Sequence, residues 1–361
     1  MPIGDRYMHP YAKLGKSLAM FAPYHHLLLI LLHALAMSSV TAFSAPRKKL
    51  AIITGGNKGI GKEIARRIGT EPGYRAIIAC RDVELGEAAA RDLRDDLRKN
   101  DHGEYAPCDA MALPVPFDLA DRASIASAAD WVREEYDGVM DVLVNNAAVC
   151  FNDPTLYGTV DHTPFVDQAG ITIRTNYIGT LYVIEAFLPM LEKSCDPKIV
   201  NVASAAGRLT ILRSQELVDE FTSDALTIPR LSELMETFVS DVENGTHSKK
   251  GWPSTCYGVS KLGIIALTKI LAREHPQMMI NSVDPGYCRT DQNDNRGTVD
   301  PYVGAYTPYL LALMESDYDE EDAEGGGGEG YSGDDDEEDE EVMSGLHFYE
   351  EREMPWTYQS S

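Results

Sequence analysis

The sequence has few cysteines, and none of them stands at a metal-binding spacing. Six cysteines are scattered over 361 residues, with no CxxC pair and no other ligand pattern. A chain of this length buries enough apolar surface to fold without disulfides, so we interpret these cysteines as free thiols. No metal site is predicted.

Basic residues are also scarce: 32 Lys and Arg face 57 Asp and Glu, for a formal net charge of −25. The absence of a basic stripe excludes nucleic acid as a predicted partner. Between Glu315 and Glu341 stand 16 acidic residues and no basic one. Because this Gly-rich, charged run cannot bury apolar surface, residues 315–344 are predicted to be a disordered insertion. Its charge would suit a basic partner.

Long apolar runs are absent as well. The strongest, HHLLLILLHALAM, lies in residues 1–47 and is too short to span a bilayer comfortably. It follows sparse basic residues and precedes the small residues of SSVTAFSAP, which is typical of a signal peptide. VTAFSAP also resembles the Ala-Phe junction of presequences for plastids with extra membranes, with cleavage between Ala42 and Phe43. We therefore predict the secretory pathway or a plastid; the alternatives are an uncleaved membrane anchor or a misplaced start codon and a cytoplasmic protein.

From Lys49 onward, short apolar runs alternate with helix-length amphipathic segments. The predicted strands are LAIITGG, RAIIACRD, VPFDL, VLVNNAA, KIVNVAS and MMINSVDPG. Continuously apolar strands of this kind predict a parallel sheet covered on both faces. We expect one doubly wound, Rossmann-type α/β domain over residues 48–314, to which the strand-like residues 345–361 return.

A long segment, residues 208–252, separates the NVAS strand from the YGVSK helix. It contains apolar residues at helical spacing, namely Leu231, Leu234, Met235, Phe238 and Val242. The segment is predicted to be a helical insertion that covers part of a cleft.

The sequence TGGNKGIG follows the first strand and opens a helix. Glycines at 55, 59 and 61 let the backbone turn tightly and approach a pyrophosphate, which then lies at a helix N-terminus. Between a strand and a helix, at the start of an alternating domain, this spacing is a strong signal of a dinucleotide site.

Basic residues near this loop indicate which nucleotide binds. Arg81 follows the second strand, where a carboxylate would otherwise hold the adenosine 2′-hydroxyl, and its planar fork suits a 2′-phosphate. Lys58, inside the glycine loop, could reach the same group. These residues favour NADPH (NADP+), although the neighbouring Asp82 leaves NAD open. Asp118, which ends VPFD, is predicted to accept a hydrogen bond from the adenine amino group.

Six motifs then occur in one order: TGxxxGxG, NNAA, TNYIGT, NVAS, YGVSK and PGYCRT. Over residues 50–314 this order resembles that of the short-chain dehydrogenases/reductases. The resemblance implies four catalytic residues, which are Asn176, Ser204, Tyr257 and Lys261. Together with the motifs, it implies the cofactor-binding residues Gly55, Asn57, Lys58, Gly59, Ile60, Gly61, Arg81, Asp118, Leu119, Asn146, Tyr257, Lys261, Pro285, Gly286 and Thr290.

Within that family, GWPSTCYGVSK and the insertion resemble the monomeric NADPH-dependent carbonyl reductases. Ser204 and Tyr257 are 53 positions apart, whereas most family members separate them far less. The resemblance implies a monomer, because the insertion should cover the helix face that related enzymes use for pairing. Two residues depart from the pattern: Ala148 replaces the last glycine of NNAG, and Asp284 precedes the PG turn where these reductases carry cysteine.

The chemistry centres on Tyr257 and Lys261, which share a helix face at a spacing of four. A free phenol has a pKa near 10, and a nearby ammonium should lower it toward the working range. The resemblance makes Tyr257 the proton donor, and places Lys261 on the nicotinamide ribose and Ser204 against the substrate carbonyl. It assigns to Asn176 a water that links Lys261 to solvent.

The predicted function is NADPH-dependent reduction of small-molecule aldehydes, ketones or quinones to alcohols. One alternative is an NAD(P)-dependent alcohol dehydrogenase for a specific metabolite. Another is an inactive nucleotide-binding scaffold whose acidic run binds a basic partner, but a scaffold has no chemical need of the four catalytic residues.

Overall fold

An eight-stranded sheet runs through the computed structural model, which describes residues 47–96, 98, 102–151, 163–314 and 343–356. The strands are β1 (Lys49–Thr54), β2 (Tyr74–Ala79), β3 (Ala110–Ala112), β4 (Val142–Asn145), β5 (Lys198–Val202), β6 (Met279–Asp284), β7 (His347–Tyr349) and β8 (Arg352–Glu353). The predicted signal segment and the acidic run fall almost entirely outside the described residues.

The strand order is β3-β2-β1-β4-β5-β6-β7-β8. All neighbouring pairs are parallel except β7 and β8. The chain moves outward from β1 to β3 and then returns to place β4 on the other side of β1. Ligands of such sheets bind at this reversal, beyond the carboxyl ends of the strands. The predicted doubly wound parallel sheet is confirmed.

The third strand differs from the prediction. Residues 115–119, VPFDL, were expected to form it, but the strand is the three-residue segment Ala110–Ala112 just before them. The two prolines of LPVPF have no N–H for a β ladder. The N–H of Phe117 still donates to the Cys80 carbonyl at 3.0 Å, so this stretch follows the sheet edge as a loop.

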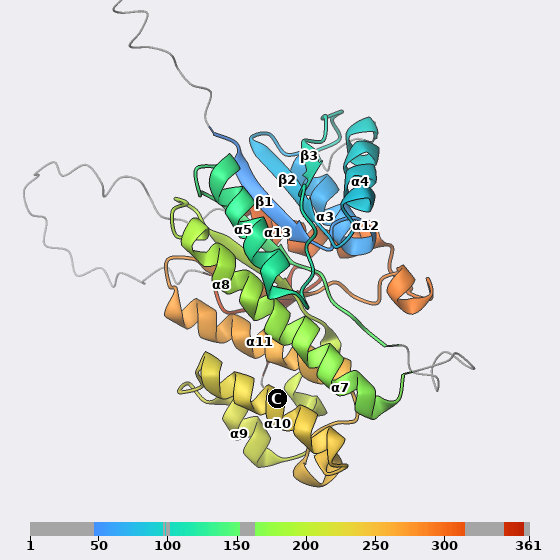
Figure 1. Cartoon of the computed structure of the whole chain (residues 1–361), viewed down its shortest axis with the longest axis vertical. Helices are drawn as coiled ribbons and strands as arrows, with labels where there is room; N and C mark the ends of the chain where they lie inside the picture. The colour runs from blue at the N-terminus through green and yellow to red at the C-terminus, as the bar shows by residue number, and fades with distance from the viewer. Residues whose placement is uncertain (1–46, 97, 99–101, 152–162, 315–342, 357–361) are drawn as a thin grey trace, which may run out of the picture. The chain divides into compact units, whose positions relative to one another are not determined.

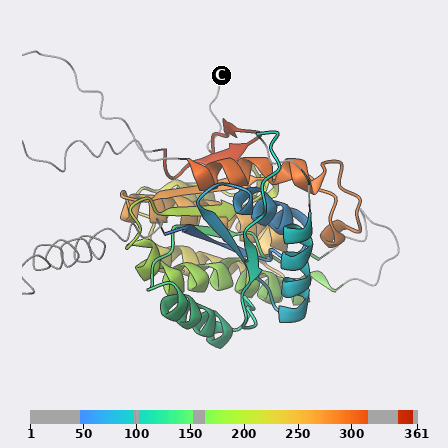
Figure 2. The same ribbon diagram turned by 90° about the horizontal axis from the view of Figure 1, so that it is seen from above.

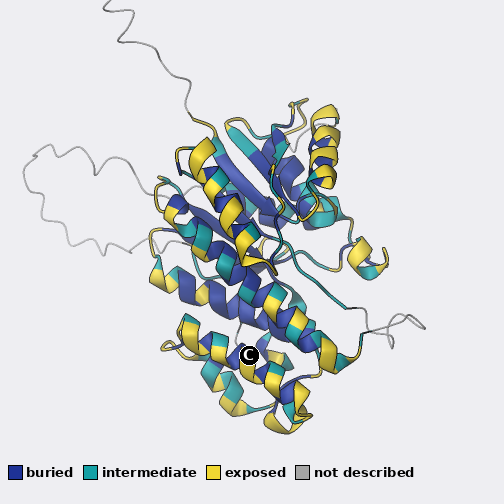
Figure 3. Ribbon diagram, in the orientation of Figure 1, coloured by how far each residue is buried: buried dark blue, intermediate teal, exposed yellow. Residues whose placement is uncertain are grey.

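Helices cover both faces of the sheet, as Figure 2 shows from above. One buried apolar cluster joins the sheet to α5, α8 and α11, and a second joins its other face to α3, α4 and α13. In Figure 3 the strands and the inward sides of these helices are buried. The bounds are α3 (Gly59–Gly69), α4 (Val83–Asp95), α5 (Arg122–Glu135), α8 (Thr180–Leu191), α11 (Cys256–Glu274) and α13 (Tyr306–Leu313). Among the described residues, no helix is long and apolar enough to cross a membrane.

The insertion forms two helices, α9 (Gln215–Thr222) and α10 (Ile228–Glu243), and α10 packs on α11 and on α7 (Phe165–Ile173) (Figure 1). The five apolar residues expected on its inner face are all buried. Trp252 anchors the insertion through an edge contact with Phe238, at 5.5 Å between ring centroids. Its indole N–H donates to the buried Asp241 carboxylate at 3.2 Å.

The C-terminal residues rejoin the sheet through β7, which pairs with β6. His347 is buried there, and its Nδ1 lies 3.0 Å from the Ser282 hydroxyl. Further along, Trp356 packs against the core, and the ammonium of Lys269 lies 5.7 Å from its ring centroid. These contacts place the end of the described chain beside α11.

Candidate active site

The N-terminal end of α11 holds the predicted proton donor. Thr255 caps the helix by accepting the Gly258 N–H at 3.0 Å, which starts the helix one residue before Tyr257. Tyr257 and Lys261 are then one turn apart, with the Lys261 Nζ 5.6 Å from the centroid of the Tyr257 ring. The structure brings the expected pair together.

Lys261 is buried, with 4% of its surface exposed. Its Nζ donates to the Val202 carbonyl at 2.6 Å, at the end of β5. Burial lowers the pKa of Lys261 to about 8, and the charges of Cys150 and Asp284 oppose this decrease. Because that value lies above neutral pH, the ammonium is the main form at pH 7.

Tyr257 behaves differently from the expectation. Burial raises the pKa of its phenol above the ordinary value, the charges of Cys150 and Asp284 raise it further, and a hydrogen bond with Ser204 opposes the increase. The prediction that Lys261 lowers the pKa of Tyr257 is therefore wrong for the protein without a bound nucleotide. Removing water from the ring disfavours the phenolate more than the surrounding groups favour it.

Ser204 follows β5 and caps the 3₁₀ turn Ala205–Gly207, where its Oγ accepts the Ala206 N–H at 3.2 Å. This turn lies directly on α11, since a Cβ on Gly207 would come within 2.6 Å of the Lys261 carbonyl carbon. Only glycine allows that approach. The contact holds the Ser204 hydroxyl beside Tyr257.

Asn176 lies in a π-helical turn, Arg174–Gly179, between α7 and α8. Its side-chain oxygen accepts the Val149 N–H at 2.8 Å, and its Nδ2 donates to the Val149 carbonyl at 2.9 Å and to Ser260 Oγ at 3.1 Å. Single π turns inside α-helices are frequent at functional sites. The amide thus links the chain after β4 to α11. The water that Asn176 is expected to hold between Lys261 and solvent stays a prediction. Ser260 was overlooked, although it stands within YGVSK.

The glycine loop lies between β1 and α3, as expected. Gly55 and Gly59 adopt positive φ angles of 67° and 56°, which favour glycine. A Cβ on Gly61 would come within 2.4 Å of Asn146 Nδ2 and 2.6 Å of the Gly55 carbonyl oxygen. Asn57 and Ile60, between them, are half-buried. This side-chain-free turn at a helix N-terminus fits a pyrophosphate.

Asn146 fastens this loop to the end of β4. Its Nδ2 donates to the Thr54 carbonyl at 2.9 Å, and its N–H donates to Thr54 Oγ1 at 3.0 Å. Thr54, the first residue of TGGNKGIG, is a site residue that the sequence reasoning missed. The two strands that flank the reversal of the sheet are thereby joined where the nucleotide is expected.

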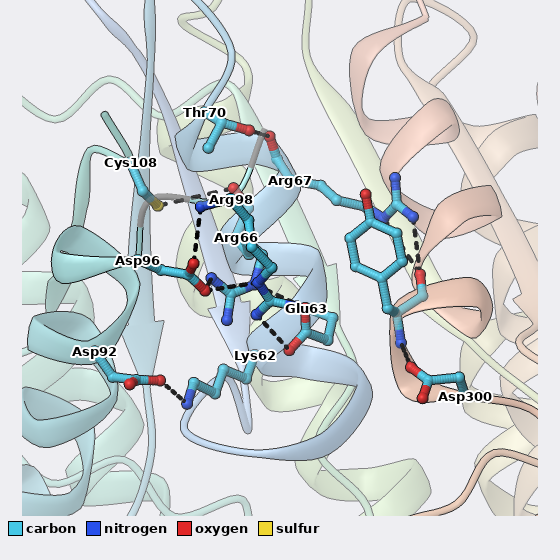
Figure 4. Close-up of polar contacts among 11 residues, drawn as sticks. Lys62, Glu63, Arg66, Arg67, Thr70, Asp92, Asp96, Arg98, Cys108 and Asp300 are labelled. Atoms are coloured by element: carbon cyan, nitrogen blue, oxygen red, sulfur yellow. Dashed lines mark hydrogen bonds and ion pairs between the residues drawn. The ribbon is translucent and has the colours of Figure 1, made fainter. Parts of the chain in front are cut away.

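Helix α3 is held from both sides (Figure 4). Arg66 pairs with Asp96, which caps the C-terminal end of α4. On the other side, Arg67 donates to the Tyr302 carbonyl at 2.9 Å and lies 3.8 Å from that tyrosine's ring centroid, on α12 (Pro301–Gly304). These contacts fix the helix whose N-terminus closes the glycine loop.

The residues expected near the 2′-phosphate differ in their contacts. Arg81 is exposed after β2, whereas Asp82 caps α4 by accepting the Leu85 N–H at 3.1 Å. The cap holds one oxygen of the carboxylate that would favour NAD, and the exposed Arg81 guanidinium suits the 2′-phosphate of NADP. Lys58 pairs instead with Asp291 at 3.0 Å, and both side chains are mostly exposed.

The residues predicted to meet the adenine lie in the loop after β3. Asp118 is half-buried and accepts the Ala120 N–H at 3.0 Å. Leu119 is buried, and its carbonyl oxygen would lie 2.4 Å from a Cβ on Gly179. The loop therefore rests on the π turn that carries Asn176.

The residues predicted to meet the nicotinamide lie in the loop after β6. Gly286 follows Pro285, has a φ of 78°, and donates its N–H to Asp284 Oδ1 at 3.0 Å. Thr290 forms a capping box with Asn293. A Cβ on Gly59 would lie 3.2 Å from Thr290 Cγ2, so this loop meets the glycine loop.

Cys150 interacts electrostatically with Tyr257 and Lys261, and sequence reasoning gave no signal for it. The thiol is half-buried and burial raises its pKa. Across the described ranges, no three His, Cys, Asp or Glu side chains gather as a metal site.

Comparison with known proteins agrees with this geometry. The short chain dehydrogenase family model matches residues 49–214. Carbonyl reductase (NADPH) 1 of Bos taurus is 36% identical over 282 residues, covering 76% of this chain and 94% of that protein. The Homo sapiens protein of the same name is 36% identical over 276 residues, covering 74% and 92%.

Two solved structures share the fold. Salutaridine reductase from Papaver somniferum has a TM-score of 0.64 at 28% identity, covering 74% of this chain and 96% of its own. Menthone neomenthol reductase from Mentha piperita has a TM-score of 0.60 at 30% identity, covering 74% and 94%. Since the motifs, the sheet and relatives spanning three quarters of the sequence agree, the chain belongs to the short-chain dehydrogenase/reductase family.

Proposed function

We propose that the protein is an NADPH-dependent carbonyl reductase that converts aldehydes, ketones or quinones to alcohols. One observation carries the proposal: the Tyr257 ring lies 5.6 Å from the Lys261 ammonium and within hydrogen-bonding reach of Ser204. This arrangement lies at the carboxyl ends of the neighbouring strands β5 and β6. The names of the relatives, carbonyl reductase (NADPH), support the same chemistry.

NADPH supplies the hydride when it is bound. Ser204 donates a hydrogen bond to the substrate carbonyl oxygen as negative charge develops on it. Tyr257 donates its proton to the same oxygen, which completes the alcohol. Lys261, charged below about pH 8, offsets the cost of the phenolate left behind. Asn176 holds the water through which that proton is replaced.

The nucleotide would be held along the edge of the sheet just described. The glycine loop and the N-terminus of α3 would hold the pyrophosphate, and Arg81 would bind the 2′-phosphate. Asp118 would accept a hydrogen bond from the adenine amino group, and Lys261 would bind the nicotinamide ribose. The turn from Pro285 to Thr290 would hold the nicotinamide amide.

The test is reduction of menadione or a simple ketone by the purified chain, followed through the loss of NADPH absorbance. Tyr257→Phe should lower kcat by about 10²- to 10⁴-fold, because it removes the general acid. The variant should bind NADPH as the wild type does. Reductase activity that survives this change, or a wild type that reduces no carbonyl, would refute the proposal.

We also propose a monomer. Helix α10 packs on α7 and α11, and the Tyr177 hydroxyl lies 3.0 Å from Ser232 of α10. The face that related enzymes would use for pairing is thus covered within the chain. Light scattering should give the mass of one chain, and a tetramer would contradict the proposal.

Residues 1–47 are proposed to direct the chain into the secretory pathway or a plastid. Their apolar core, flanked by basic and then small residues, supports this role. Mass spectrometry of the native protein should find Phe43 at its N-terminus. A native chain that begins at Met1 would contradict cleavage.

The acidic run, residues 315–344, is proposed to bind a basic partner. A variant without residues 315–342, which keeps the hydrogen bonds of Met343 and Ser344 to the sheet, should keep its kcat/KM but lose binding to polylysine; equal binding by both chains would contradict this role.

A further inference from the structure

The turn that ends α10 carries an acceptor sequence for N-linked oligosaccharides. Asn244, Gly245 and Thr246 read Asn-Gly-Thr, and no other asparagine of the chain has Ser or Thr two positions later. Such a sequence is glycosylated only in proteins that pass through the secretory lumen. The proposed reductase chemistry makes no use of it.

The acceptor asparagine lies on the outer side of the insertion. Helix α10 buries an apolar stripe as it packs on α7 and α11. Positions 233, 237, 240 and 244 follow one another at helical spacing on its other side, and all four are exposed. A Cβ on Gly245 would meet no atom within 4 Å, so the space around the turn is open. An oligosaccharide on Asn244 would therefore extend into solvent.

The fold has no conformational need of asparagine at this position. The left-handed residue that ends α10 is Gly245, with a φ of 67°, whereas Asn244 has a φ of −84°, which other residues adopt equally well. Asn244 Nδ2 donates to the Ser240 carbonyl at 2.8 Å and lies 3.3 Å from Ser240 Oγ, both in the last turn of the same helix. An exposed local bond of this kind adds little stability. The amide nitrogen is thus accessible for modification.

We propose that Asn244 is a site of N-linked glycosylation. The inference rests on the signal segment proposed for residues 1–47, because the transfer takes place in the secretory lumen. Asn244 Nδ2 forms a bond to the anomeric carbon of an oligosaccharide carried on a lipid diphosphate. The bond from that carbon to the diphosphate oxygen breaks, the lipid diphosphate leaves, and Nδ2 gives up one of its two hydrogens as a proton. The hydrogen that stays on Nδ2 keeps a donor for the Ser240 carbonyl.

Thr246, the third residue of the acceptor sequence, also has a role in the fold. Its Oγ1 donates to the Asp241 carbonyl at 3.3 Å and to Asp241 Oδ1 at 3.2 Å. The same buried carboxylate accepts the Trp252 indole N–H. Loss of the Thr246 hydroxyl would therefore disturb the insertion as well as the acceptor sequence. Asn244→Gln removes the acceptor alone, and Thr246→Ser keeps a hydroxyl for both purposes.

The test is in vitro translation of the full chain with and without endoplasmic-reticulum microsomes, followed by protease treatment and gel electrophoresis. With microsomes, a protease-protected form should migrate more slowly, and endoglycosidase H should remove this shift. Asn244→Gln should stay protected but lose the shift completely, whereas Thr246→Ser should keep it.

Three results would overturn the inference. A protected wild type without the shift would show that Asn244 is not modified, and a shift that survives Asn244→Gln would place the oligosaccharide elsewhere. A wild type that the protease digests has not entered the microsomes, which would refute the proposed signal segment and the inference with it. Carbonyl reduction is measured separately on the purified chain, so each of these results leaves the proposed reductase activity standing.

Discussion

The ammonium of Lys261 donates to the carbonyl oxygen of Val202 at 2.6 Å. This bond joins the second turn of α11 to the end of β5, two elements more than fifty residues apart in the sequence. It holds the charge beneath the Tyr257 ring. The proposed proton donor is therefore positioned by the sheet as well as by its own helix.

Burial of Lys261 should make stability depend on alkaline pH. Burial lowers its pKa from 10.5 to about 8, so between these values the unfolded chain binds more protons than the folded one. The free energy of unfolding of the wild type should then rise with pH over this window, by roughly 3 kcal/mol relative to Lys261→Met. Urea denaturation at pH 8 and pH 10.5 measures the difference. Lys269→Met, on the exposed side of α11, should keep the wild-type dependence of the free energy of unfolding on pH. A Lys261→Met variant that also kept this dependence would contradict its assignment to Lys261.

His347 should make the fold sensitive to acid. Burial, together with the charges of Arg208 and Lys269, lowers its pKa from 6.5 to about 4. The unfolded chain therefore binds more protons between pH 6.5 and 4, and stability should be lost as the pH falls through this range. The loss attributable to His347 is roughly 3 kcal/mol. Urea denaturation of His347→Asn should show a shallower slope, while the exposed His102→Gln should resemble the wild type. Equal slopes for all three would rule out His347 as the source.

Nucleotide choice should depend on Arg81 and be tuned by Asp291. Arg81→Gln should weaken NADPH binding by at least tenfold and leave NADH binding nearly unchanged, because only NADPH carries the 2′-phosphate.

Asp291→Asn releases Lys58 from its ion pair. It should tighten NADPH binding by up to about fivefold, which corresponds to the free energy of an exposed ion pair. Calorimetric titration of both nucleotides tests this. If Asp291→Asn changed NADH binding equally, Lys58 would not act on the phosphate.

Gly61 should tolerate no side chain. Its Cβ would lie 2.4 Å from Asn146 Nδ2 and 2.6 Å from the Gly55 carbonyl oxygen, so Gly61→Ala must distort the glycine loop. We expect NADPH binding to weaken at least tenfold, while the far-ultraviolet circular dichroism stays native. The matched control is Gly170→Ala in α7, where the nearest atom would be 3.9 Å away. It should bind normally and gain about 0.5–1 kcal/mol of stability. Normal binding by Gly61→Ala would refute the close approach.

The sequence by itself determined the alternating parallel sheet, the glycine loop and the Tyr257–Lys261 pair. These features depend on local periodicity and on short spacings, which set which side chains share a strand face or a helix turn. The helical insertion was predicted for the same reason.

Only the tertiary structure decided the rest. It moved the third strand to Ala110–Ala112, paired Lys58 with Asp291 and bonded Asn176 to Val149. It also reversed the expected direction of the Tyr257 pKa. Each of these outcomes depends on burial or on contacts between residues distant in the chain, and neither a local pattern nor a motif spacing carries that information.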